Sequence, residues 1–243
     1  MSLSWDALEL LEVILLRLKV LYGFEMDVKG SRVEKFEEVM QMYMPTIPTQ
    51  ITIEVGGKNK EIDLFQYLLR ILFWRPRDII KYFAVLYDAN EKNMHKHKKI
   101  DMVTLKNLLN NVTEDIIKNE FYNEYDKIFY NIEEFMNIFM GSDVIISVSK
   151  FIDMILEYKF EGVLFEEENQ LLAKMNLLYE FGIIGLKFET KYIKEKSIGN
   201  VLCFVFNEGM FPFDKAKDEL LKRTKKIKIV LNPIFSKNFV IFA

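Results

Sequence analysis

Hydrophobic residues recur at helical spacing along most of the chain. Between Ser4 and Tyr22, five leucines lie three or four positions apart: Leu8, Leu11, Leu15, Leu18 and Leu21. This spacing predicts one apolar face of a helix. Ser4 is a suitable N-cap, and Gly23 stands where a glycine often ends a helix. The pattern predicts an N-terminal amphipathic helix over residues 4–22.

The same periodicity continues to about residue 140, with one interruption. It predicts helices near 31–43, 63–74, 76–90, 102–111, 113–130 and 132–140. Between these helices, Ile51, Ile53 and Val55 alternate with polar residues and are followed by Gly56-Gly57. Alternation ending in a glycine pair is typical of a hairpin, so we expect a short one near 47–62.

The pattern changes again after residue 145. Helical periodicity near 148–159 and 166–181 is followed by strand-like runs at 183–189 and 201–206, a short helix at 213–223 and a strand at 227–231. Two helices followed by a two-stranded hairpin are the order of a winged helix-turn-helix. We therefore expect a mainly α protein that ends in a winged helix with a small β-hairpin.

Composition supports this fold class. The 243 residues include only 10 glycines and 5 prolines, whereas an all-β protein needs many turns built from them. A hydrophobic content of 50% excludes disordered and collagen-like chains. One cysteine excludes an internal disulfide framework and fits a reducing compartment. No run resembles a membrane span or a secretory signal, so we expect a cytoplasmic protein without a membrane partner.

Arginine is rare and unevenly placed. Three of the six arginines lie within eight residues: Arg70, Arg75 and Arg77. The planar, permanently charged guanidinium suits phosphate or carboxylate. Pro76 favours an extended Arg75 and the first position of a helix, where the dipole and unbonded amides attract anions. Arg75 or Arg77 is thus a candidate phosphate contact, with a surface salt bridge to Asp78 or Asp63 as the alternative.

The segment Trp74-Arg75-Pro76-Arg77-Asp78-Ile79-Ile80 resembles the Arg-Pro-Arg-Asp element of bacterial P-loop ATPases of the AAA+/STAND type. In those proteins the element opens a helix of the α-helical lid, whose arginine reaches the terminal phosphates of the nucleotide. The resemblance implies that Arg75 or Arg77 has this role. The segments 171–185 and 232–235 are similar to the C-terminal winged helix of the same proteins. The implied domains are a lid-like domain at 1–95, a helical connector at 96–145 and a winged-helix domain at 146–243.

The chain departs from those ATPases in lacking a phosphate-binding loop. None of its glycines stands in G-x-x-x-x-G-K-[ST], and Gly56-Gly57-Lys58-Asn59 lacks the upstream glycine and the hydroxyl. We expect no catalysis and no cofactor in this chain alone, with ATP bound only together with the P-loop core of a parent protein. The expected function is the lid and winged-helix portion of such an ATPase, coupling nucleotide state to DNA or protein binding. The alternative is a stand-alone winged-helix transcription regulator or interaction adaptor, in which the lid-like half is an effector domain or forms a homo-oligomer.

Basic residues gather on and after the expected wing. The candidates for nucleic-acid contact are Lys187, Lys191, Lys194, Lys196, Arg223, Lys225 and Lys226. They could contact phosphates. Against this, the net charge is −3, and the helix at 166–181 carries few groups able to read base edges. DNA contact and protein contact both stay open.

Other reactive residue types have simpler interpretations. His95 and His97 are flanked by lysines that repel a metal cation, so we expect solvated side chains and no metal site. Cys203 lies in an apolar, strand-like run and is expected to be buried and unreactive. Residues 166–168, three glutamates, suit the first turn of a helix.

Overall fold

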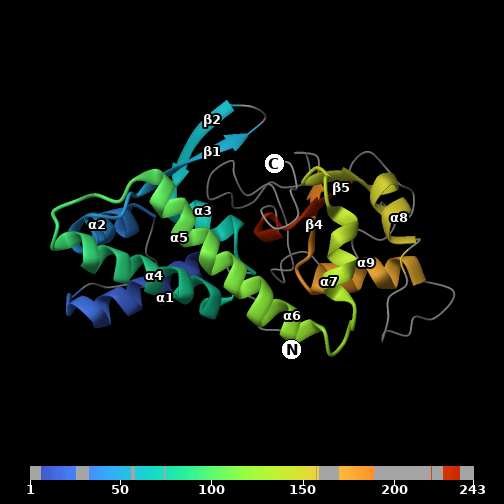
Figure 1. The fold of residues 1–243 in the computed structure, drawn as a ribbon, viewed down its shortest axis with the longest axis horizontal. Coiled ribbons are helices and arrows are strands. Elements are labelled where there is room, and N and C mark those ends of the chain that lie inside the picture. Colours follow the sequence, from blue (N-terminus) through green and yellow to red (C-terminus); the bar gives the residue numbers. More distant parts are fainter. Residues whose placement is uncertain are drawn as a thin grey trace. The chain divides into compact units, whose positions relative to one another are not determined.

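The chain folds into two compact units. The computed structural model describes residues 7–25, 33–55, 58–73, 75–156, 158, 170–188, 220 and 227–235. One unit is Leu3–Ile116, and the other is Ile117–Ala243 with Met1–Ser2. Within the described ranges the chain is mainly helical, with small antiparallel sheets (Figure 1). The expected mainly α class is confirmed, while the division into 1–95, 96–145 and 146–243 stays a prediction.

The unit Leu3–Ile116 combines helices with one hairpin. Its elements are α1 (Ala7–Tyr22), α2 (Val33–Tyr43), β1 (Gln50–Val55), β2 (Lys58–Asp63), α3 (Leu64–Arg70), α4 (Pro76–Met94) and α5 (Met102–Asp115). The strands β1 and β2 pair antiparallel from Gln50–Asp63 to Val55–Lys58, as the alternating pattern predicts. In Figure 1 this hairpin projects from the helices, and α4 packs against both α1 and α5.

Helix α1 shows where the leucine pattern is correct and where it is wrong. Its buried residues are Ala7, Leu10, Leu11, Ile14, Leu15 and Leu18. Leu8 and Leu21 are 45% and 55% exposed, because Leu10 and Ile14 shift the centre of the apolar stripe away from them. Gly23 has a φ of +66°, and its N–H donates to the Lys19 carbonyl at 2.9 Å. The predicted glycine end is confirmed, while Ser4 lies outside the described residues.

Aromatic packing joins the middle helices of this unit. The Phe36 ring of α2 lies 5.4 Å from the Phe65 ring of α3 and 5.7 Å, edge-on, from the Phe83 ring of α4. Phe36 and Phe65 are fully buried. Burial of such rings is the main source of stability in a small core.

The unit that begins at Ile117 alternates short helices with strands. Its elements are the π-helix η1 (Ile116–Phe121), α6 (Tyr122–Tyr125), α7 (Ile132–Met136), the 3-10 helix η2 (Asn137–Phe139), β3 (Ile145–Ser147), α8 (Val148–Leu156), α9 (Gln170–Glu180), β4 (Ile184–Phe188), β5 (Ile227–Leu231) and the 3-10 helix η5 (Pro233–Phe235). The helical run from residue 102 is continuous to residue 125, so the predicted break near residue 112 and the predicted end at residue 130 are wrong. Burial of Leu109, Val112 and Ile116 outweighs the low helix propensity of Asn110-Asn111.

The sheet of this unit has β5 in the middle. The strand order is β3-β5-β4, and both pairings are antiparallel. The structure therefore pairs β4 with β5, whereas the sequence paired 183–189 with a strand at 201–206 that lies outside the described residues. Strand β3 was not predicted, because three residues are too short for a periodic signal.

Helices α8 and α9 pack against this sheet, and buried phenylalanines fill the same unit. Helix α8 contacts β3 and β5, and α9 contacts α8 and β4. Within the described part of this unit, the fully buried phenylalanines are Phe121, Phe129, Phe135, Phe139, Phe151 and Phe235. Phe121 and Phe235 pack at 5.2 Å between ring centroids, which joins the beginning of the unit to η5.

Candidate functional site

The start of α4 has the geometry that the sequence predicts. Arg75 is the N-cap in an extended conformation (φ −112°, ψ 137°), and Pro76 is the first helical residue. The Arg75 guanidinium carbon lies 5.5 Å from the centroid of the Phe73 ring. A cation over an aromatic face is attracted to it, so Phe73 helps to hold the guanidinium in place.

Asp78 fixes the turn that precedes α4. Its side chain is fully buried, and Oδ2 accepts a hydrogen bond of 3.2 Å from the Phe73 backbone N–H. Its Oδ1 lies 3.6 Å from Nε of Arg77, whose side chain is 50% exposed. Arg77 thus makes the ion pair foreseen as the structural alternative. Asp78 thus contacts both the Phe73 backbone and the Arg77 side chain.

Tyr82 holds the same turn from the other side. Its hydroxyl donates to the Ile71 carbonyl at 2.8 Å and lies 2.7 Å from Oγ1 of Thr113 on α5. Burial is the main cause that raises the pKa of Tyr82, so the hydroxyl stays protonated. The Tyr82 and Asp78 contacts pin the segment between α3 and α4, and Arg75 is presented from a fixed backbone.

The N-terminal end of α4 offers few free backbone N–H groups to an anion. Pro76 has no N–H, and the N–H groups of Asp78 and Ile79 donate to the Arg75 carbonyl at 3.1 and 3.4 Å. A ligand here would depend mainly on the Arg75 guanidinium. The third arginine, Arg70, ends α3, where burial lowers its pKa and the Tyr67 side chain acts in the opposite direction. Arg70 nevertheless stays charged at any physiological pH.

Most of the other predicted site residues lie outside the described residues. Lys187 lies on β4 opposite Lys228 of β5. Six of the predicted basic contacts lie outside the described residues: Lys191, Lys194, Lys196, Arg223, Lys225 and Lys226. Cys203 and residues 166–168 lie outside them too.

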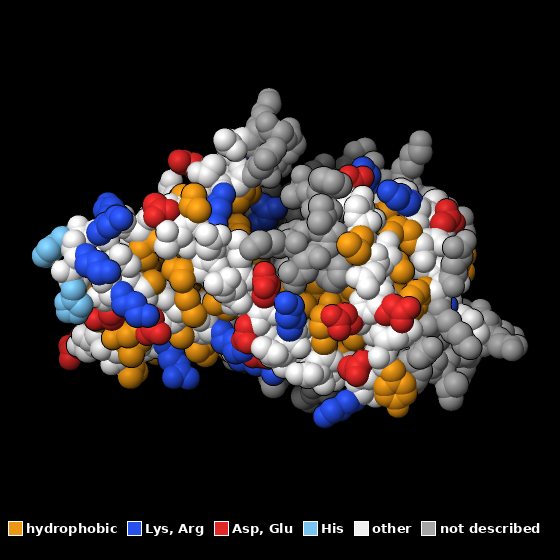
Figure 2. All heavy atoms as spheres, in the orientation of Figure 1, with side chains coloured by type: hydrophobic (Ala, Val, Ile, Leu, Met, Phe, Trp, Pro, Cys, Tyr) orange, Lys and Arg blue, Asp and Glu red, His pale blue; other side chains and the backbone are white. Residues whose placement is uncertain are grey.

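The histidines occupy an exposed turn after α4, and His97 has a positive φ of 49°. Figure 2 shows both histidine side chains with lysine or arginine side chains beside them, at one tip of the face drawn. Across the described ranges, no three His, Cys, Asp or Glu side chains are grouped so that they could hold a metal ion. In these ranges, no carboxylate or thiol joins the two histidines as a third metal ligand.

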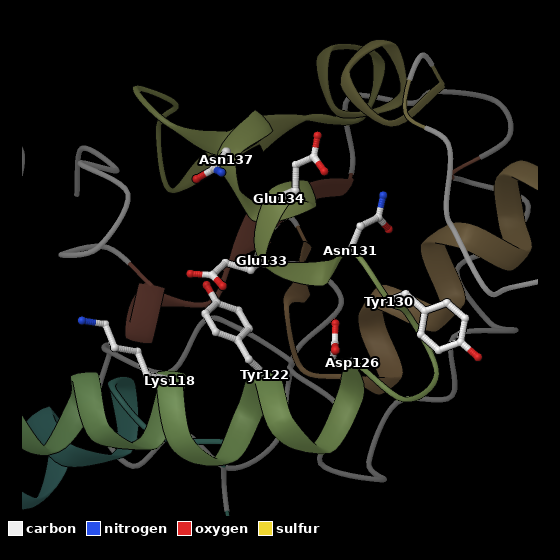
Figure 3. A pocket seen from close by; sticks show the side chains of 8 residues that line it. All are labelled: Lys118, Tyr122, Asp126, Tyr130, Asn131, Glu133, Glu134 and Asn137. Carbon is white, nitrogen blue, oxygen red and sulfur yellow. The ribbon is translucent and has the colours of Figure 1, made fainter.

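A second candidate lies in the unit that begins at Ile117, and the sequence did not indicate it. A cleft of about 640 Å³ opens between α7 and the run of η1 and α6 (Figure 3). We call it the acidic cleft and define it by its lining residues, Lys118, Tyr122, Asp126, Tyr130, Asn131, Glu133, Glu134 and Asn137. Figure 2 shows acidic side chains over α6 and α7 on the same face.

Tyr122 and Asn131 give the acidic cleft a defined wall. In Figure 3 the Tyr122 hydroxyl points toward the Glu133 carboxylate. Burial first, and the negative charge of Glu133 second, raise the pKa of Tyr122. The Asn131 side-chain amide donates to the Tyr158 hydroxyl at 2.8 Å, and the Tyr158 ring packs edge-on against Phe135 at 5.1 Å.

The sequence signal for the acidic cleft is weak. Lys118, Tyr122 and Asp126 are four residues apart, and Glu133 and Asn137 repeat that spacing. This places each set on one side of its helix. Polar residues at such spacing are also typical of an ordinary solvent face, so the pattern alone does not reveal a cleft.

Two further findings bear on function. Among the helices that the structure describes, none is both long and apolar enough to cross a membrane. Comparison of the chain with models of known families, with curated proteins and with solved structures gave no match.

Proposed function

We propose that this chain is the non-catalytic lid and winged-helix portion of a P-loop ATPase, and that it couples nucleotide state to the binding of DNA or a protein. The nucleotide-binding core would come from the parent protein or from a neighbouring chain. In this proposal Arg75 contacts the terminal phosphates. The unit that begins at Ile117 contacts the partner.

The observation that best supports the proposal is the topology of the second unit. Helix α7 is followed by β3, then by α8 and α9, and then by β4 and β5. The strand between the first two helices pairs with the last strand, which gives the order β3-β5-β4. This order of elements agrees with the one expected for a winged helix, in which α9 would be the second helix of the helix-turn-helix. The connection 189–226 between β4 and β5 then corresponds in sequence to the wing.

The charge of that connection agrees with a contact surface. Six of the seven predicted basic contacts fall between β4 and β5 in sequence, and Lys187 lies on β4 itself. Lysines and arginines in a wing suit phosphate oxygens. The acidic net charge of −3 opposes a strong overall attraction of the chain to nucleic acid.

Support for phosphate sensing comes from Arg75 rather than Arg77. Arg75 stands on a turn held by Asp78 and Tyr82, over the Phe73 ring. Its N-cap position also places it where the helix dipole favours an anion. Arg75 is therefore the arginine that we assign to the nucleotide.

Tryptophan fluorescence can test this assignment directly. Trp74 precedes Arg75 in sequence, and Trp5 is the only other tryptophan, so a Trp5→Phe chain reports from this position. We expect ATP or tripolyphosphate to change the tryptophan emission at low salt, with a dissociation constant of about 1 mM. Binding should be this weak because a single arginine contacts the phosphates and the nucleotide-binding core of the parent protein is absent. Arg75→Gln should abolish the change, and Arg77→Gln, the matched control, should keep most of it. An Arg75→Gln chain that responds like its parent would refute the assignment.

A stand-alone winged-helix regulator is the second candidate, and the basic connection between β4 and β5 favours it. A gel shift with duplex DNA over a series of salt concentrations separates the two functions. We expect the Lys191→Glu, Lys194→Glu variant to lose retention at low salt, because phosphate contacts dominate such binding. Equal retention of variant and parent chain would exclude the wing as the DNA-binding surface. DNA binding without any phosphate response at Arg75 would favour the stand-alone regulator.

A further inference from the structure

The helix that runs from Met102 to Tyr125 contains one turn that is not α-helical (Figure 1). Its segment η1, between α5 and α6, is a π-helix. A π-turn closes its backbone hydrogen bonds over five residues instead of four, so it holds one residue more than the α-turn that it replaces. The unit Leu3–Ile116 ends at the first residue of η1, and the next unit begins at Ile117. The inserted residue therefore lies where the helix leaves one unit and enters the other.

The pattern of buried positions shifts by one residue at η1. Up to its start, the buried side chains are spaced as on one face of an α-helix: Leu105, Leu109, Val112 and Ile116. That face would continue at residue 119 or 120, but Asn119 is exposed, and the next buried side chains are Ile117 and Phe121. One residue of an α-helix turns the chain by about 100°. A continuous α-helix would therefore turn Phe121 away from its buried position, and the π-turn compensates for this shift.

Contacts with distant parts of the chain hold the helix in the π register. The fully buried Phe121 ring lies 5.2 Å, edge-on, from the Phe235 ring of η5 and 4.9 Å from the Tyr125 ring. The Tyr125 ring lies 4.1 Å from that of Phe181, the residue after α9. These ring contacts depend on the register, because a turn of the helix by one residue carries Phe121 and Tyr125 out of their positions.

The local backbone favours an ordinary α-helix instead. π-Helices account for well under about 1% of residues in globular proteins. The exposed side of η1, residues 118–120, contains no glycine or proline that would interrupt an α-helix. At the start of η1 the Ile116 N–H is shared between the Thr113 and Val112 carbonyls, so it is not committed to one hydrogen-bond spacing. This conflict between local preference and distant packing reduces the difference in free energy between the two registers.

We propose that η1 is a register switch, which exchanges between the π-turn of this structure and a continuous α-helix. In the α register Phe121 leaves Phe235 and Tyr125 leaves Phe181, so the helix releases η5 and the end of α9. Because buried rings must separate, the α register is the minor state, with a population of about 1%. The switch itself does not depend on the proposed function. Its regulatory role does rest on that function: a partner that binds only the docked α9 would favour the π register.

Relaxation-dispersion NMR of the isoleucine methyl groups in the full chain tests the proposal, because it detects minor states that exchange within microseconds to milliseconds. We expect exchange at one common rate at Ile116 and Ile117 of η1 and at Ile234 of η5, and none at Ile14, which is buried on α1. Deletion of Asn119 removes the inserted residue and should abolish the exchange. Asn119→Ala keeps the chain length and should retain it.

Urea unfolding followed by circular dichroism distinguishes an inserted residue from an ordinary helical one. Deletion of Asn119 leaves the buried faces aligned in an unbroken α-helix, so the midpoint should lie within about 0.5 M of the parent chain. The matched control is deletion of Asn107, an exposed asparagine of α5. This deletion turns Leu105 away from the face of Leu109 and should lower the midpoint by more than about 1 M.

Three results would overturn the proposal. The first is the absence of exchange at Ile116 and Ile117 in the parent chain. The second is exchange that persists unchanged after deletion of Asn119. The third is a loss of stability on deletion of Asn119 as large as that on deletion of Asn107, because η1 would then contain no residue that the helix can lose.

Discussion

Replacing Asp78 by alanine should destabilise the unit Leu3–Ile116 more than any exposed change on the same helix. The variant loses the hydrogen bond from the Phe73 N–H to a fully buried carboxylate and leaves that N–H without its acceptor. A hydrogen bond to a charged group contributes about 1.5–3 kcal/mol. The Arg77 pair adds at most about 0.5 kcal/mol, because half of that side chain is in water. The expected loss in free energy of unfolding is about 2–3 kcal/mol.

Urea unfolding followed by tryptophan fluorescence measures this loss. Trp5 and Trp74 are the two tryptophans of the chain, and both belong to the unit Leu3–Ile116, so their emission follows that unit. With a slope near 2 kcal/mol per molar urea, the midpoint should fall by about 1 M. Asp88→Ala, at an exposed aspartate of α4, should cost less than about 0.5 kcal/mol.

The outcomes of this series distinguish hydrogen bonding from charge. Asp78→Asn keeps an acceptor for Phe73 and loses only the charge, so its loss should lie between those of Asp78→Ala and the parent chain. If Asp78→Ala costs no more than Asp88→Ala, the carboxylate does not hold the turn. The assignment of Arg75 as a pre-positioned group would then fail as well.

Further predictions concern buried hydroxyls and titrating groups. Tyr82→Phe should lower the free energy of unfolding by about 1–3 kcal/mol in the same urea assay, because the buried Ile71 carbonyl loses its donor. The losses caused by Tyr82→Phe and Thr113→Val should not add up in the double variant, and simple additivity would contradict the coupling of the two hydroxyls. Hydrogen bonds from the Thr104 N–H and hydroxyl lower the pKa of Asp101. The ionised Asp101 therefore contributes its full stabilisation of the folded chain above the ordinary aspartate pKa of about 3.9, and this stabilisation is lost as the pH falls below that value. Urea unfolding of Asp101→Ala should therefore differ from the parent at about pH 6 and converge with it in acid, and a constant difference would contradict this. Burial raises the pKa of Tyr22 to about 12, so stability should fall as the pH rises from about 10. At about pH 11 the folded chain should show less tyrosinate absorbance than the urea-unfolded chain, and Tyr22→Phe should narrow that difference.

Local features of the fold could be predicted from the sequence. Gly23 ends α1, Pro76 begins α4, and the alternation before Gly56-Gly57 gives the hairpin of β1 and β2. Each of these signals acts through the conformation of one or two residues. No distant partner is needed to interpret them.

Features that depend on distant contacts could not be predicted. Asn110 and Asn111 are poor helix formers, and the helix continues across them because the neighbouring Leu109 and Val112 are buried. The pairing of β3 with β5 joins segments about eighty residues apart, for which the local pattern contains no information. The acidic cleft likewise arises where α7 meets η1 and α6, and each element alone has an ordinary polar surface. The Arg75 turn and the ion pair of Arg77 with Asp78 could be predicted, but the burial of Asp78 and its bond to the Phe73 N–H could not.

The central position of β5 determines the order in which the chain can fold. Ile145 pairs with Val230, and Ile184 with Leu231, so neither β3 nor β4 has this partner until synthesis has passed residue 231. The unit Leu3–Ile116 can fold earlier on the ribosome, whereas the sheet forms late and through long-range contacts. A nascent or truncated chain that ends before Ile227 would lack the middle strand of this sheet. The edges of β3 and β4 that β5 occupies would then be exposed to pairing with other chains, and such products should aggregate unless chaperones retain them.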